Sequence, residues 1–211
     1  MLSDELDGSA EPDVERLRSL WAILRDNPQE AIPGLEELAE RGSVASMYFL
    51  ANYYRFGNRT KAFSGKWDEL AAIDLQKAEK WYRQAAEAGM VRGYYHLGII
   101  YYNQMRFLEA KEAYEKAALG KFSGAMRLLA HMYFRGDGVE EDRTKARSLL
   151  SEAVELGNIR AMQELALVMR KFDHGFSRWL SIAKLYAKAF RRTFGLAKTK
   201  GDETIFSDEF R

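Results

Sequence analysis

Arginine is the residue type in this sequence best placed to bind a ligand, because it recurs at helical spacing beside tyrosine, histidine and amide side chains. A planar guanidinium pairs with carboxylate or phosphate oxygens through two hydrogen bonds, and a neighbouring tyrosine adds contact area at small entropic cost. Six arginines and no acid occur in four short sets: Tyr48, Asn52 and Arg55; Arg92, Tyr95 and Tyr102; Arg127, His131 and Arg135; and Arg160, Gln163 and Arg170. These sets predict binding of an anionic ligand.

Residues that could form a catalytic or metal centre do not converge. His96, His131 and His174 stand far apart, without the paired spacing of a zinc site, and the chain has no cysteine. The acids at 140–142 cluster, but they adjoin turn and helix-capping signals. No phosphate-binding glycine loop is visible. We therefore predict no enzymatic activity, no metal and no cofactor.

Two recurring apolar stripes predict the helices that carry the arginines. The first stripe is centred on Leu50, Leu97, Leu129 and Leu165, which follow one another in steps of 47, 32 and 36 residues. The second recurs as Ala78, Tyr82 and Ala85, as Ala110, Tyr114 and Ala117, and as Ala146, Leu150 and Ala153. The pattern predicts an all-α, right-handed α-solenoid of about five antiparallel helix pairs, with the first helix of each pair on the concave side.

Composition and breakers predict three segments. Residues 1–11 are acidic and predicted to be disordered, residues 12–196 form the solenoid, and residues 197–211 form a flexible tail. The long first step contains a polar insertion at residues 58–66. A last helix, about residues 177–194, has aromatic residues on one face and basic residues on the other, and we expect it to cap the final repeat.

Helix ends are predicted from capping residues and glycines. Asp13 is expected to begin the first helix, which ends near Asp26, and Asp142 is expected to cap a later one. Three helices end at equivalent glycines, Gly42, Gly89 and Gly157. In the third pair the glycine, Gly120, comes one residue early, so Lys121 takes the aligned position.

The repeats resemble Sel1-like repeats, a branch of the tetratricopeptide-type helical solenoids. The resemblance covers about residues 31–170 and is carried by AEKWYRQAAEAGMVRGYYHLGIIYY (78–102) and AMRLLAHMYFRGDGVEEDRTKARSLLSEAVELGNIRAMQELA (125–166). Departures are the long insertion, the displaced Gly120, and Met169 where the family usually has an aromatic residue. The resemblance implies an adaptor or scaffold that assembles protein complexes.

Together these patterns predict a protein-binding adaptor whose basic concave groove holds an acidic peptide or protein segment. The competing interpretation is that the arginines pair with acids of neighbouring helices. In a variant of the groove hypothesis, the chain's own acidic tail occupies the groove.

A different function, membrane association through the basic 177–194 helix, is open but less favoured than a capping role. The pI of about 7.9 and the lack of a recognition motif argue against nucleic-acid binding. The sequence also predicts a cytoplasmic location, since it has no cysteine and its acidic start does not resemble a secretory signal.

Overall fold

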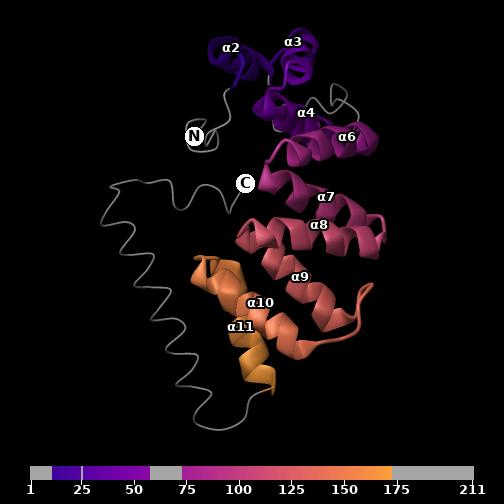
Figure 1. Cartoon of the computed structure of the whole chain (residues 1–211), viewed down its shortest axis with the longest axis vertical. Helices are drawn as coiled ribbons and strands as arrows, with labels where there is room; N and C mark the ends of the chain where they lie inside the picture. Colours follow the sequence, from indigo (N-terminus) through magenta and orange to yellow (C-terminus); the bar gives the residue numbers. More distant parts are fainter. Residues whose placement is uncertain (1–10, 25, 58–72, 173–211) are drawn as a thin grey trace, which may run out of the picture. The chain divides into compact units, whose positions relative to one another are not determined.

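The computed structural model describes residues 11–24, 26–57 and 73–172, with side chains described as far as residue 169. All regular structure in these residues is helical, as predicted (Figure 1). The helices are α2 (Val14–Leu24), α3 (Pro28–Glu40), α4 (Val44–Phe56), α6 (Leu75–Glu87), α7 (Val91–Asn103), α8 (Phe107–Leu119), α9 (Ser123–Arg135), α10 (Arg143–Glu155) and α11 (Ile159–Phe172). The predictions for residues 1–10, the insertion, the capping helix and the tail lie outside the described residues.

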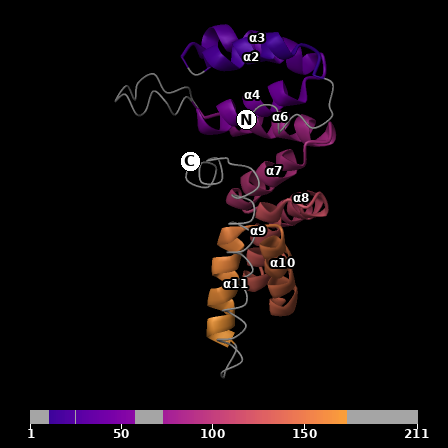
Figure 2. The ribbon, with the colours of Figure 1, turned by 90° about the vertical axis from the view of Figure 1, so that its left-hand side faces the viewer.

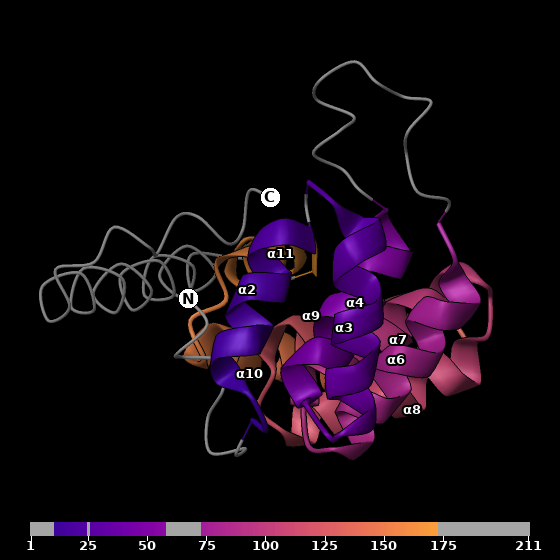
Figure 3. The same ribbon diagram turned by 90° about the horizontal axis from the view of Figure 1, so that it is seen from above.

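The chain divides into two compact units, residues 1–113 and 114–211, and each is described by itself. In unit 1 every helix packs against the next along the chain, from α2 through α3, α4 and α6 to α7; Figure 3 looks along this succession. In unit 2 α10 packs against both α9 and α11, which run beside it in Figure 2. Packing between sequence neighbours is what a helical repeat requires, because no helix pair buries its apolar stripe alone.

The two predicted stripes are the buried faces of these helices. Leu50, Leu97, Leu129 and Leu165 are at most 4% exposed, and the six alanines of the second stripe are fully buried. Small residues let neighbouring helices approach closely. At Gly93 in α7 an added Cβ would lie 2.8 Å from the Tyr82 carbonyl oxygen in α6. The stripe prediction is confirmed.

The helix ends follow the predicted signals. Asp13 accepts a hydrogen bond from the Arg16 amide at the start of α2, and Asp142 accepts one from the Lys145 amide at the start of α10, both at 2.9 Å. The three terminating glycines have φ between 92° and 100°. Lys121 has a φ of 61° and takes the left-handed conformation that glycine supplies in the other repeats.

A carboxylate from outside the repeat holds the start of α4. Glu11 accepts hydrogen bonds from the Ser43 hydroxyl at 2.5 Å and from the Ala45 amide at 3.0 Å. Ser43 is only 1% exposed, and a negative charge at a helix N-terminus is favoured by the helix dipole. Residue 11 thus contacts α4 at the predicted boundary between the acidic start and the solenoid.

Candidate partner-binding surface

A histidine links the two helices of unit 1 that carry predicted site residues. We call this surface the α4–α7 face, defined by Tyr48, Asn52, Arg55, Arg92, Tyr95 and Tyr102. Arg55 Nη1 lies 2.6 Å from His96 Nδ1, and the Tyr48 hydroxyl lies 3.0 Å from His96 Nε2. Because a guanidinium can only donate, Nδ1 is the acceptor, and Nε2–H of the neutral ring donates to the Tyr48 oxygen.

A tyrosine from the second helix α6 packs under this contact. The Tyr82 ring stacks on His96 with centroids 4.8 Å apart, and its hydroxyl donates to Asn52 Oδ1 at 2.8 Å. Tyr48 is only 9% exposed, so its side chain belongs to the helix–helix contact rather than to an open groove wall. The other five residues of the α4–α7 face are partly buried and reach the surface.

The α4–α7 face carries positive charge around a neutral imidazole. Burial is the largest cause, and the charges of Arg55 and Arg92 act in the same direction; together they lower the pKa of His96 from its ordinary value of 6.5 to about 3. Both guanidinium groups therefore act on one site. Burial also raises the pKa of the Tyr82 hydroxyl, which stays protonated and able to donate. The face thus presents two fixed positive charges without a titrating group at neutral pH.

The predicted site residues of unit 2 meet an acid that the sequence analysis missed. We call this surface the α9–α11 face, defined by Arg127, His131, Arg135, Arg160, Gln163 and Arg170. Arg127 Nη1 donates to Glu164 Oε1 at 3.0 Å, and His131 Nε2 lies 2.9 Å from Glu164 Oε2. Arg135, Arg160 and Gln163 are exposed. Arg170 lies in α11, beyond the described side chains.

Electrostatics confirm that Glu164 is a carboxylate held by two partners. Burial raises its pKa, but the hydrogen bond from His131 and the charges of His131 and Arg127 outweigh burial and hold that pKa below its usual range. Arg127 is 15% exposed and Glu164 26%. Arg127 therefore pairs with an acid of a neighbouring helix, as the competing interpretation predicted.

The two linking residues occupy the same place in their repeats. His96 directly precedes Leu97, and Glu164 directly precedes Leu165. Their partners Tyr48 and Arg127 both stand two residues before the leucine of the preceding first helix in their unit. Tyr48 and Arg127 were predicted site residues, whereas His96 and Glu164 were not. Aligning the repeats on the leucines and asking which polar residue faces the preceding first helix could have found both.

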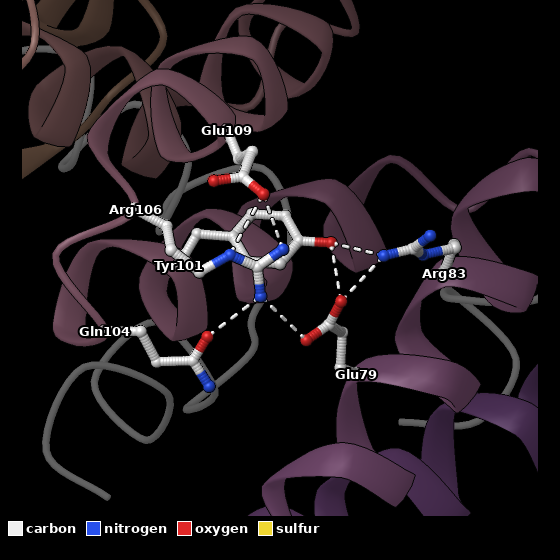
Figure 4. Close-up of polar contacts among 6 residues, drawn as sticks. All are labelled: Glu79, Arg83, Tyr101, Gln104, Arg106 and Glu109. Carbon is white, nitrogen blue, oxygen red and sulfur yellow. Dashed lines mark hydrogen bonds and ion pairs between the residues drawn. The ribbon is translucent and has the colours of Figure 1, made fainter.

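A second polar cluster in unit 1 has balanced charges. Arg106 donates to Glu109 at 2.6 Å and to Glu79 at 3.2 Å, with its guanidinium 4.3 Å from the centre of the Tyr101 ring. Figure 4 shows how Glu79 also receives Arg83 and the Tyr101 hydroxyl. Two arginines meet two glutamates, so this cluster joins α6 to the turn between α7 and α8 and offers no net charge to a ligand.

The family comparison supports the repeat boundaries seen in the fold. The family model described as Sel1 repeat matches residues 44–90 and 123–158. The first span holds α4 and α6, and the second holds α9 and α10, each a first and a second helix. The chain contains Sel1 repeats. The α7–α8 pair between these Sel1 repeats carries the same apolar stripes without being matched itself.

Solved structures with similar folds include other repeat proteins. A protective antigen of uropathogenic Escherichia coli displaying an SLR fold aligns over 74% of this chain with 24% identity and a TM-score of 0.63. The alignment covers 33% of that antigen, so this chain spans about a third of its length. A Sel1 repeat protein from Oxalobacter formigenes is 27% identical, with 62% of this chain and 93% of that one covered and a TM-score of 0.48.

An immunity protein from Pseudomonas aeruginosa also shares the fold, with 20% identity, 85% of this chain and 66% of that chain covered, and a TM-score of 0.50. The antigen and the immunity protein show the helical-repeat fold alone. No curated protein matches this chain at a significant level.

Proteins with Sel1 repeats generally mediate protein–protein interactions. In the part of the chain that the structure describes, no cluster of three or more histidine, cysteine or acidic residues could hold a metal ion. Within the same residues, no helix combines the length and apolar character needed to cross a bilayer.

Proposed function

We propose that this chain is a protein-interaction adaptor whose α4–α7 face binds an acidic segment of a partner protein. The observation that carries the proposal is the convergence of Arg55 and Arg92 on a neutral histidine. Arg55 contacts the His96 imidazole, the Phe56 ring and the Tyr82 hydroxyl, which are all neutral groups. An arginine held by neutral groups keeps a positive charge that can attract an incoming anion.

The surroundings of the two arginines suit a peptide better than a small ion. Tyr95 and Tyr102 lie on α7, one turn or more apart, and both are partly exposed. Aromatic side chains contribute contact area with few rotatable bonds, and arginine and tyrosine are the residue types that dominate binding energy at interfaces. We expect acidic side chains of the partner to pair with the arginines while its apolar groups cover the tyrosines.

The test removes both charges and keeps hydrogen-bonding groups in their place. Arg55→Gln/Arg92→Gln is compared with Arg18→Gln/Lys80→Gln, in which two exposed cations of α2 and α6 are neutralised in the same unit. Binding of a fluorescein-labelled oligoglutamate peptide is followed by anisotropy, and proteins retained from lysate are compared by mass spectrometry.

Loss of one charged hydrogen bond costs about 1.5–3 kcal/mol, so affinity should fall by roughly 10-fold or more in the first variant only. Circular dichroism must show equal helicity in both variants. Equal affinity of the two variants for the peptide, and equal retention of partners, would contradict the proposal.

A further inference from the structure

In unit 2 two side chains that lie one helical turn apart on α9 bind the Glu164 carboxylate. Arg127 holds one carboxylate oxygen at 3.0 Å and His131 holds the other at 2.9 Å. Residues four apart on a helix lie on the same face, so the two donors form a fork aimed at one carboxylate. The acid comes from the next first helix, α11, and not from α9 itself.

This arrangement is what recognition of an acidic side chain from another molecule requires. Each oxygen of the carboxylate receives its own nitrogen partner, which is the geometry of a strong charge-assisted contact. The site is also reachable, because the side chains of Glu164 and His131 are 26% and 39% exposed. Because solvent reaches the pair, an external acid at sufficient concentration can compete with Glu164 for the two donors.

We propose that Arg127 and His131 form a second carboxylate-binding site, which Glu164 occupies in the unbound chain and an aspartate or glutamate of a partner protein occupies on binding. Arg160 supports entry of such a partner, since it is exposed on α11 one turn before Glu164. In unit 1 the position equivalent to Glu164 holds His96, which has no charge to compete with a ligand. Glu164 therefore competes with a partner's acid for Arg127 and His131 in unit 2, and unit 1 has no such acid at the equivalent position.

The test weakens the internal competitor without removing its hydrogen-bond acceptor. Glu164→Gln is compared with wild type and with Glu140→Gln, which removes one negative charge from an exposed turn of the same unit. The probe is the fluorescein-labelled oligoglutamate peptide at low salt. Because Glu164→Gln removes the competing charge, affinity should rise about 5-fold or more in Glu164→Gln and stay unchanged in Glu140→Gln.

A further variant tests whether any gain in peptide affinity depends on Arg127 and His131. In Glu164→Gln/Arg127→Gln the gain should disappear; if it persists, or if Glu164→Gln binds no better than Glu140→Gln, the proposal is overturned. Should Glu164→Gln lose helicity, the ring resonances of His131 in wild-type protein decide instead, since they must shift when peptide is added, and unchanged resonances overturn the proposal.

This inference and the proposed function fail separately. Arg55→Gln/Arg92→Gln reports only on unit 1, and Glu164→Gln only on unit 2. Binding by Glu164→Gln without binding by wild type would support the second site while removing the α4–α7 face. Binding by wild type that is lost in the unit 1 variant and insensitive to Glu164→Gln would do the reverse.

Discussion

Acidification from pH 8 to pH 5 should destabilise the fold through His96, the imidazole between α4 and α7. In the folded chain burial and two nearby arginines lower the pKa of this ring to about 3, whereas in the unfolded chain it titrates near 6.5. Below 6.5 the unfolded state therefore takes up a proton that the folded state excludes. Stability is full above pH 6.5 and falls as pH drops from there to about 3.

The size of the effect at pH 5 depends on the unfolded pKa and hardly at all on the folded one. Each pH unit below 6.5 costs about 1.36 kcal/mol while the folded ring stays neutral, so the free energy of unfolding should decrease by about 2 kcal/mol at pH 5. A folded pKa of 2 or 4 would change this value little. The prediction therefore does not depend on how far the pKa falls once it is well below 5.

Urea unfolding followed by circular dichroism at pH 8 and pH 5 measures the effect, with His96→Asn as the reference. In the variant an amide oxygen can accept from Arg55 where Nδ1 does, and it does not titrate. Carboxylates and His131 are present in both proteins, so their contributions cancel in the difference. If wild type and His96→Asn lose equal stability between the two pH values, the neutral state of His96 in the folded chain is refuted.

Two further predictions concern one close approach and one cap. Gly93→Ala should destabilise the fold by roughly 1–3 kcal/mol, because the new methyl group meets the Tyr82 carbonyl oxygen at 2.8 Å, and an unchanged urea midpoint would contradict that approach. Asp142→Ala should cost about 1 kcal/mol through loss of the α10 cap, whereas Asp142→Ser should retain most stability in the same assay; equal loss in both would exclude capping as the cause.

Local rules were sufficient to predict the repeats and their ends. Apolar periodicity located the buried faces, and aligned glycines located the helix ends, because both depend on residues close in sequence. Even the irregular end was predictable: once Gly120 was seen to be displaced, Lys121 was left at the aligned position, where the structure gives it a positive φ. Such features do not depend on which repeat packs beside which.

The side-chain partners were less predictable, because they depend on the position of a second helix. Arg55 and Arg127 were selected by the same reasoning, yet one meets a neutral histidine and the other a carboxylate. A helical wheel assigns a residue to a face but does not show how far its side chain extends across to the next repeat. The prediction of a basic groove therefore included an arginine that Glu164 neutralises.

The equivalence of His96 and Glu164 indicates how a repeat fold varies charge without changing its packing. In both units, the residue before the leucine receives a polar side chain from the preceding first helix. The packing at these two places accommodates either chemistry, since a neutral pair and an ion pair both satisfy partly buried polar groups. In these two repeats a single residue, His96 or Glu164, thus determines whether the surface around it stays positive or is neutralised, while the leucines and alanines beneath it stay buried.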